Sequence, residues 1–438
     1  MTQLPYDLTS PQSILQFAAG LSGKTLSQAV NLVDTLENVK NKGDLGTMVE
    51  RYYFGYEPNS TKGPDFAEAG VELKTTGVKK ASTGKYKAKE RLVLNMIDYV
   101  QLVDEQWSNS SLLAKCRVML ILFYLYEKDV PVFDRRFVLD PVLFSFPVED
   151  LAVIQRDWET IRDKILAGKA HELSEGDTFY LAACRKGSGG VGEKLRKQPF
   201  SDVGAKSRAF SLKPSYVNRI INDFTSEASS LDITDGSIEA ATEQKFQPYL
   251  GMAVDDIALK LDFHKKGKND KGYYSNLTMR ILGGKKLVTA ELEKAGIEPK
   301  TIRVNKNWMP KEAMSFPTFK YMEIIDEQWE DSKFYSKIEQ KFLFVVYRYD
   351  ENDVLRLEGV KYWNMPYSDR VEAQRVWEDT RRRVGVDASD LPSSSESTVA
   401  HVRPKGRNAL DVLPTPQGTM LQKKCFWLNK AYIASQIR

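Results

Sequence analysis

Cysteine and histidine are scarce in this chain, with only three of each among 438 residues. Cys116, Cys184 and Cys425 lie far apart, which excludes a disulfide framework and suits a reducing cytoplasm. The histidines fit no zinc-ligand spacing, so any metal chemistry has to rest on carboxylates. The sequence also lacks an apolar run of membrane-spanning length and a secretory signal. We therefore expect a cytoplasmic protein that does not associate with membranes.

An excess of one charge is missing as well, because 63 lysines and arginines stand against 59 acidic residues and leave a net charge of +4. A nucleic-acid surface would therefore have to come from local clusters. Residues 72–91 and 184–213 contain seven and eight basic residues, each against two acidic residues. Either segment alone is typical of a solvated basic face. Together, and beside the motif described next, they favour contact with a phosphate backbone.

The segment GPDFAEAGVELKTTGVKK contains the residue types from which metal-dependent nucleases build an active site. Asp65 is followed, after six residues, by Glu72 and Lys74 in the pattern D-x6-E-x-K. If residues 71–76 form a strand, its period of two places Glu72 and Lys74 on one face and sends the intervening apolar side chains to the core. This arrangement indicates phosphodiester hydrolysis.

A bare D-x6-E-x-K pattern is common by chance, and the alternative is a solvated strand edge on which Lys74 simply pairs with Glu72. In a catalytic site, the carboxylates of Asp65 and Glu72 would share Mg²⁺, which needs only one or two of them and keeps several waters. Lys74 would then lie next to developing negative charge. Both one-ion and two-ion schemes use this residue set.

The motif and its surroundings, LSGKTLSQAV at 21–30 and KNKGDLGTMVERYYFG at 40–55, resemble the MutH-like endonucleases. This family joins the mismatch-repair nicking enzyme to restriction enzymes specific for GATC. Its order is a Lys-Gly dipeptide, a glutamate in a G-x-x-x-E helix and the D-x6-E-x-K set. The matching positions here are Lys42-Gly43, Glu50, Asp65, Glu72 and Lys74.

The resemblance implies an α/β protein with the restriction-endonuclease-like fold, PD-(D/E)XK, in which a mixed central sheet is flanked by helices. It also makes Glu50 an auxiliary metal ligand beside Asp65 and Glu72. The local sequence leaves a second possibility open, because Glu50 lies at the edge of an apolar helical stripe and could equally be a surface glutamate.

Sequence readout would rest on base-edge contacts, among which arginine or lysine to guanine is the commonest. By resemblance, the candidates in the first half are Lys42, Gly43, Arg185, Lys186 and Ser211. The chain departs from the family here, because Cys-Arg-Lys replaces Arg-Pro-Lys at 184–186 and a serine replaces the repair enzyme's tyrosine.

An apolar segment at 118–126 predicts a buried central strand. Lys115 and Arg117 precede it. One of them would touch the scissile phosphate, with an ordinary strand-end charge as the equal alternative.

The second half of the sequence repeats the first. VDEQW at 103–107 recurs as IDEQW at 325–329, and each copy is followed by an apolar segment, at 118–126 and 341–349. Trp158-Glu159 likewise recurs further along the chain as Trp377-Glu378. These collinear matches predict two tandem copies of one domain.

The second copy has lost the catalytic pattern, since Glu298-Pro299-Lys300 stands where Glu72-Leu73-Lys74 stands. Proline removes an N–H from a strand and confines it to an edge or a bulge. Opposite Asp65 and Glu50 stand Glu291 and Ile281. The DNA-contacting candidates Arg403, Lys405 and Trp427 are retained, which predicts a binding or effector domain that does not cut.

The residues between 223 and 240 are rich in serine, threonine and acids, so we expect a catalytic domain at 1–222, a linker at 223–240 and an effector domain at 241–438. The expected function is a Mg²⁺-dependent type II restriction endonuclease that makes double-strand breaks at GATC. Its partner would be double-stranded DNA, with a dimer or a DNA loop formed through the second domain. The alternatives are a mismatch-repair nicking enzyme and a noncatalytic DNA-binding regulator.

Overall fold

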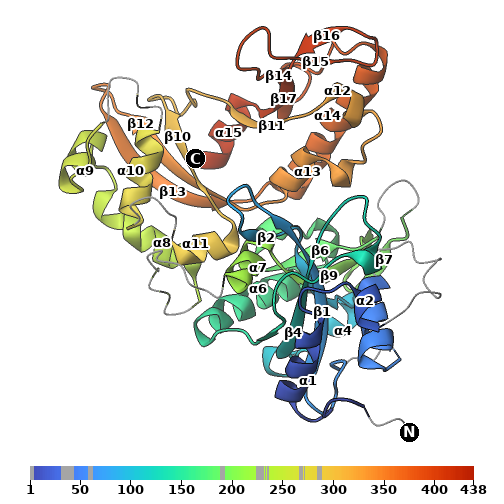
Figure 1. Cartoon of the computed structure of the whole chain (residues 1–438). Helices are drawn as coiled ribbons and strands as arrows, with labels where there is room; N and C mark the ends of the chain where they lie inside the picture. Colours follow the sequence, from blue (N-terminus) through green and yellow to red (C-terminus); the bar gives the residue numbers. More distant parts are fainter. Residues whose placement is uncertain are drawn as a thin grey trace.

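The computed structural model describes residues 4–30, 44–57, 63–187, 193–222, 231, 233, 236–265, 270, 272–283 and 289–438. These residues form two halves, drawn from blue to green and from yellow to red in Figure 1. Within the described chain, no helix is long and apolar enough to cross a membrane.

The first half contains a four-stranded mixed sheet in the order β2-β1-β4-β5 and a three-stranded antiparallel sheet in the order β3-β9-β6. β1 and β4 run parallel, with Val71 opposite Val118, and β5 is antiparallel to β4. A short hairpin, β7–β8, is inserted between β6 and β9. The strands are β1 (Val71–Lys80), β2 (Tyr86–Ala88), β3 (Leu92–Met96), β4 (Val118–Leu125), β5 (Val142–Phe144), β6 (Leu181–Arg185), β7 (Arg196–Gln198), β8 (Ser201–Ala205) and β9 (Arg208–Leu212).

The sequence patterns explain these elements. β4 is the buried central strand predicted from the apolar segment 118–126, and this prediction is confirmed. β1 is also confirmed as a strand, and Val71 and Leu73 enter a core with α1 and α3. The helices of this half are α1 (Pro11–Ala18), α2 (Leu26–Val30), α3 (Asp44–Met48), continued by a π-helical segment (Val49–Phe54), α4 (Tyr99–Leu102), α5 (Ser111–Cys116), α6 (Val148–Leu166) and α7 (Pro214–Ile221).

The second half has sheets of the same type, in the orders β10-β12-β13 and β11-β17-β14. β10 runs parallel to β12, β13 is antiparallel to β12, and the hairpin β15–β16 lies between β14 and β17, as β7–β8 lies between β6 and β9. The strands are β10 (Pro299–Val304), β11 (Met314–Thr318), β12 (Phe342–Tyr349), β13 (Leu355–Trp363), β14 (Ala400–Pro404), β15 (Val412–Pro414), β16 (Met420–Gln422) and β17 (Lys424–Leu428). The helices are α8 (Ile238–Phe246), α9 (Val254–Lys260), α10 (Tyr273–Ile281), α11 (Ala290–Ala295), α12 (Tyr321–Ile324), α13 (Lys333–Ile338), α14 (Tyr367–Val386) and α15 (Lys430–Ile437).

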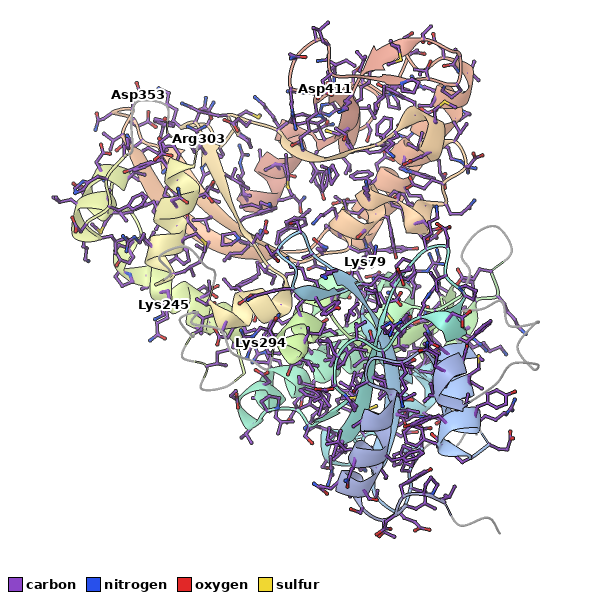
Figure 2. All side chains as sticks on the ribbon, viewed as in Figure 1. Lys79, Lys245, Lys294, Arg303, Asp353 and Asp411 are labelled. Atoms are coloured by element: carbon purple, nitrogen blue, oxygen red, sulfur yellow. The ribbon has the colours of Figure 1, made fainter. Side chains whose placement is uncertain are left out.

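The two halves share a hydrophobic core, to which Trp158 and Phe210 contribute from the first half and Leu292 and Tyr347 from the second. A buried ion pair joins Lys294 of α11 to Asp150 of α6. Figure 2 labels Lys294 where α11 meets the first half. α8 begins at residue 238, inside the predicted linker 223–240, but residues 223–230 lie outside the described chain, so the domain boundary stays a prediction.

Candidate active site

Glu72 and Lys74 lie side by side on the face of β1 that is turned away from Val71 and Leu73. Lys74 Nζ is 2.7 Å from Glu72 Oε1 and also donates a hydrogen bond of 2.9 Å to the carbonyl of Leu94 on β3. The side chain of Glu72 is only 3% exposed. This pair is therefore not a solvated strand edge, because burying a charged group is costly unless the fold supplies partners for it.

Asp65 is tied to the same strand by two hydrogen bonds. Its backbone N–H donates to Glu72 Oε2 at 3.2 Å, and its own Oδ2 accepts from the backbone N–H of Leu73 at 2.9 Å. Gly70 reverses the chain between them with a φ of +67°, a conformation that glycine adopts without a steric cost. The predicted grouping of Asp65, Glu72 and Lys74 is thus found in the fold.

Glu50 joins this acidic group from the π-helical segment that follows α3. Burial, with the nearby charges of Asp65 and Glu72, raises the pKa of Glu50 to about 7. Burial also raises the pKa of Glu72, against the opposing effect of Lys74. The hydroxyl of Tyr56 is buried without a hydrogen-bond partner, and its pKa is raised by burial and then by Asp65 and Glu50. At Glu50, burial and the neighbouring carboxylates outweigh the opposing effect of Lys74 and Lys115, so the site is rich in oxygen ligands.

These residues fit a hard cation. In the part of the chain that the structure describes, no three histidine, cysteine or acidic side chains are grouped so as to hold an ion by themselves. Mg²⁺ does not require such a group, because one or two carboxylates, several waters and the substrate phosphate usually complete its coordination. A cation beside Glu50, Asp65 and Glu72 would favour the ionised form of the carboxylates.

The other candidate site residues of the first half fall into three groups. Lys115, at the end of α5, has its Nζ 3.5 Å from Glu72 Oε1, so it belongs to the acidic group. Lys42 and Gly43 lie outside the described residues. Ser211 is fully buried in β9, and its hydroxyl is 3.3 Å from the carbonyl of Ala182, so a direct contact between Ser211 and a base does not agree with this conformation.

Arg185 and Lys186 lie at the end of β6, but they differ in their surroundings. Arg185 pairs with Glu193 at 2.5 Å and with Glu330 of the second half. Lys186 is half-buried, and its backbone N–H bonds to the carbonyl of Ser207. Sequence reasoning missed Glu330, which follows the repeated IDEQW segment directly, because nothing in the spacing links it to residue 185.

The second half places its corresponding residues quite differently. Glu298 and Lys300 lie 3.7 Å apart with side chains 83% and 44% exposed. Ile281 is part of the shared apolar core, and Glu291 is buried with its Oε2 accepting from the backbone N–H of Leu231. No acidic group equivalent to Glu50, Asp65 and Glu72 is therefore assembled from these residues.

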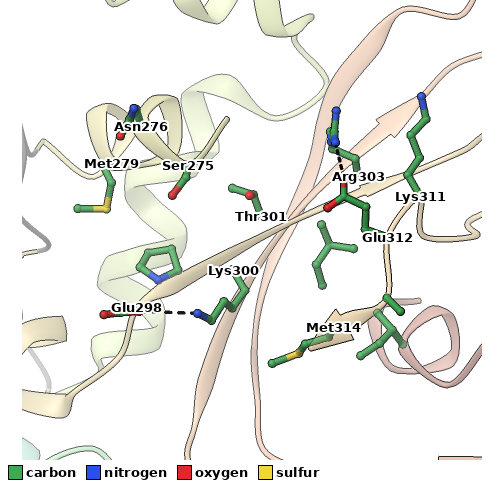
Figure 3. Close-up of a pocket in the computed structure, with 14 residues that line it drawn as sticks. Ser275, Asn276, Met279, Glu298, Lys300, Thr301, Arg303, Lys311, Glu312 and Met314 are labelled. Carbon is green, nitrogen blue, oxygen red and sulfur yellow. Dashed lines mark hydrogen bonds and ion pairs between the residues drawn. The ribbon is translucent and has the colours of Figure 1, made fainter. Parts of the chain in front are cut away.

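A cavity of about 580 Å³ lies along β10 and is lined only by residues of the second half. Figure 3 shows Lys300 and Lys311 at this cavity, with the ion pairs Glu298–Lys300 and Arg303–Glu312. This cavity is not a candidate catalytic site despite its size. Its two acidic lining residues, Glu298 and Glu312, each pair with a basic residue, and its lining residues include no cluster of carboxylates.

The readout candidates of the second half lie on β14, its following loop and β17. The guanidinium of exposed Arg403 stacks on the Trp427 ring, 4.2 Å from its centroid, and the Trp427 indole N–H donates to the carbonyl of Arg403 at 3.3 Å. Lys405 donates to the carbonyl of Phe316 at 2.8 Å. Arg185 pairs with Glu330, but among the ion pairs of the described residues Arg403 has none.

A family model described as "DNA mismatch repair enzyme MutH" matches residues 54–157 and 286–374, one segment in each half. Type II restriction enzyme Sau3AI of Staphylococcus aureus is 35% identical over 92% of this chain and 94% of its own length. The chain belongs to the MutH family. The DNA mismatch repair proteins MutH of Shewanella woodyi and Escherichia coli K12 are 24% and 28% identical, and each covers 50% of this chain with 94% and 96% of its own length.

Membership in the MutH family indicates a site-specific nuclease with the restriction-endonuclease-like fold, in agreement with the mixed α/β architecture. The prediction of this family from the sequence is confirmed.

Proposed function

We propose that the chain is a Mg²⁺-dependent type II restriction endonuclease that makes double-strand breaks at GATC, and that its first half performs the chemistry. The observation that carries the proposal is the buried group of Glu72, Lys74 and Asp65 beside Glu50. The likeness to Sau3AI over nearly the whole chain supports the restriction branch. The GATC sequence rests on the motif resemblance described above.

In this proposal Asp65 and Glu72 hold the metal, with Glu50 as the auxiliary group. Bound Mg²⁺ would polarise the scissile phosphate and lower the pKa of the attacking water. Lys74 is held between Glu72 and the carbonyl of Leu94, so its ammonium has a fixed place next to the phosphate, where it stabilises developing negative charge. Lys115 adds a second positive charge, with its Nζ 3.5 Å from Glu72 Oε1.

The second half is proposed to be a copy of the same domain that binds DNA without cutting it. Apart from β2, which has no counterpart among the described strands of the second half, the strand order β1-β4-β5 matches β10-β12-β13 and β3-β9-β6 matches β11-β17-β14. This correspondence, and the family match in each half, support a duplication. Exposed Glu298 and Lys300 support the loss of catalysis, and the Arg403–Trp427 stack supports a retained DNA contact. A protein with two DNA-binding halves can engage two sites and loop the DNA between them, which raises the effective concentration of the second site.

Digestion of a plasmid with a single GATC site in the presence of Mg²⁺ tests the activity. Linear product supports a restriction enzyme, open circles support a nicking enzyme of mismatch repair, and unchanged supercoiled DNA with retained binding supports a noncatalytic regulator. A plasmid in which the GATC is scrambled and a reaction with EDTA are the controls.

The effector role requires a separate comparison in the full-length chain. A plasmid with two sites should be cut faster than one with a single site, and added uncut GATC duplex should accelerate cutting of the single-site plasmid. The double variant Arg403→Ala and Lys405→Ala should remove both effects and keep the slow cutting of the single-site plasmid. Equal rates on both plasmids for wild type would contradict the effector role and leave the catalytic proposal standing.

A further inference from the structure

The hairpin β7–β8 carries an aromatic side chain at a position that sterics reserve for glycine. Gln198 pairs with Ser201, so Pro199 and Phe200 form the turn between the two strands. Phe200 has a φ of +60°, and its side chain is 72% exposed. After a proline, a turn with positive φ at its third residue normally carries glycine or asparagine. A bulky residue there is strained, and no packing of this exposed ring repays the strain.

The turn backbone is held firmly even though the ring is free. The carbonyl of Phe200 packs against Gly168, so closely that a Cβ on Gly168 would come within 2.5 Å of it. The corresponding hairpin of the second half, β15–β16, uses Gly418 with a φ of +80° in its turn. The second-half turn is longer, running from 415 to 419, and it places glycine at its positive φ, whereas the two-residue turn of β7–β8 places phenylalanine there.

The hairpin is also basic. Residues 194–197, Lys-Leu-Arg-Lys, are all exposed. Among the described ion pairs, Lys194, Arg196 and Lys197 have none, whereas Glu193 is occupied by Arg185. Exposed cations that flank exposed apolar side chains complement a nucleic acid, which offers phosphates beside the apolar faces of sugars and bases.

A short path connects this hairpin to the acidic group. Lys74 bonds to the carbonyl of Leu94 on β3, and β3 ends two residues later at Met96, which pairs with Ala209 of β9. The backbone N–H of the next residue, Ile97, donates to the carbonyl of Arg208, three residues after the hairpin ends at Ala205. A strand advances about 3.4 Å per residue, so the base of the hairpin is well within the width of a duplex from Lys74.

We propose that β7–β8 is a wing that binds the DNA flanking the cleavage site, with Phe200 inserted into a groove and with Arg196 and Lys197 on backbone phosphates. The inference rests on the proposed function, because it assumes that DNA lies across the acidic group of the first half. It commits to duplex DNA as the partner. Binding of a second copy of the chain is the rival outcome, and sedimentation would reveal it.

The decisive variant is Phe200→Gly in the full-length chain, because it separates structure from contact. Glycine relieves the strained φ, so the Tm should stay equal or rise, whereas affinity for a 30-base-pair GATC duplex should fall roughly tenfold. Fluorescence anisotropy in EDTA measures the binding without cutting. Leu259→Ser, which removes an equally exposed apolar side chain from α9, should leave the affinity unchanged.

The basic part is tested by the salt dependence. Arg196→Ala with Lys197→Ala should lower the slope of log Kd against log salt by about 2, because each lost phosphate contact removes about 0.9. Three results would each contradict the proposed wing: unchanged affinity of Phe200→Gly, a fall in its Tm, or a concentration-dependent dimer that this variant abolishes. If wild type binds GATC and scrambled duplexes equally, the proposed sequence specificity fails, while the comparison of Phe200→Gly with wild type remains valid on either duplex.

Discussion

β1 in the first half and β10 in the second each run parallel to the apolar strand beside them, and a Glu-x-Lys pair lies on β1 and at the start of β10, yet the two pairs lie in opposite environments. The Glu72 side chain is 3% exposed and 2.7 Å from its lysine, whereas Glu298 is 83% exposed and 3.7 Å from Lys300. Pro299, which lacks an N–H, begins β10, so Glu298 falls before the strand. The residue types alone therefore do not make the site; burial and neighbouring carboxylates do.

The same contrast holds for the residues around each pair. In the first half, Glu50 and Asp65 complete the acidic group. In the second half, Ile281 lies in the hydrophobic core, and Glu291 accepts a hydrogen bond from the backbone N–H of Leu231. In the second half, α11 instead joins the two halves, because its Lys294 pairs with Asp150 of α6.

The contrast between the two Glu-x-Lys pairs is tested most strongly by replacing Lys74 and Lys300 in turn. Lys74→Ala should reduce cleavage by on the order of a hundred- to a thousandfold, because a fixed charge next to the phosphate is lost. Lys300→Ala is the matched control and should cut a single-site plasmid at the wild-type rate. Single-turnover digestion measures both variants, and circular dichroism checks the fold. Comparable losses in the two variants would show that both halves take part in the chemistry.

A second difference concerns stability. Asp157 in α6 is buried, accepts three backbone hydrogen bonds from residues 179–181 at the start of β6, and faces buried Lys213. Burial lowers the pKa of Lys213, and Asp157 opposes this effect. The second half, aligned on its repeated tryptophan, has the apolar Val376 at this position. The first half thus holds the start of β6 with a buried carboxyl group that the second half does without.

Asp157→Ala should accordingly destabilise the protein by about 3–5 kcal/mol, because it leaves a buried lysine and three backbone donors without their partner. Asp163→Ala removes an exposed acid from the same helix and should change stability by less than about 0.5 kcal/mol. Urea unfolding measures both. A small effect of Asp157→Ala would mean that Lys213 is neutral and that water replaces the carboxylate.

Readout provides the third comparison, between a base contact and a backbone contact. If Lys186 touches a guanine edge, Lys186→Ala should cost about 1–3 kcal/mol on GATC and relax discrimination against other sequences. Lys85→Ala, at the exposed tip of the β1–β2 hairpin, should weaken binding to all sequences alike. Competition binding with GATC and scrambled duplexes separates the two; equal losses on both duplexes for Lys186→Ala would make it a backbone contact.

The sequence predicted the parts of the fold and the site that depend on local pattern. The strand at 71–76, the buried strand at 118–126 and the family followed from alternation, apolar length and the spacing of Asp65 and Glu72, because these signals lie within single elements. Partners that tertiary packing brings in from distant elements had no such signal. Lys74 donates to the carbonyl of Leu94, Arg185 pairs with Glu330, and Ser211 is buried in β9. These contacts depend on how the sheets pack, which residue spacing does not encode.

The smallest expected effect concerns the pairing of Arg185. Glu330 of the second half holds Arg185, whereas Arg403 in the second half rests on Trp427 and faces solvent. An arginine engaged by a carboxylate has to exchange that partner for DNA. Glu330→Gln should therefore tighten binding of the GATC duplex a few-fold, by roughly 1 kcal/mol or less, since a partly exposed ion pair contributes little.

Asp331→Asn removes an exposed charge next to Glu330 and is the control for the general electrostatic effect. Anisotropy titrations at two salt concentrations measure the difference. Equal tightening by both variants would assign the effect to net charge, and weaker binding of Glu330→Gln would mean that the pair with Glu330 positions Arg185 for DNA.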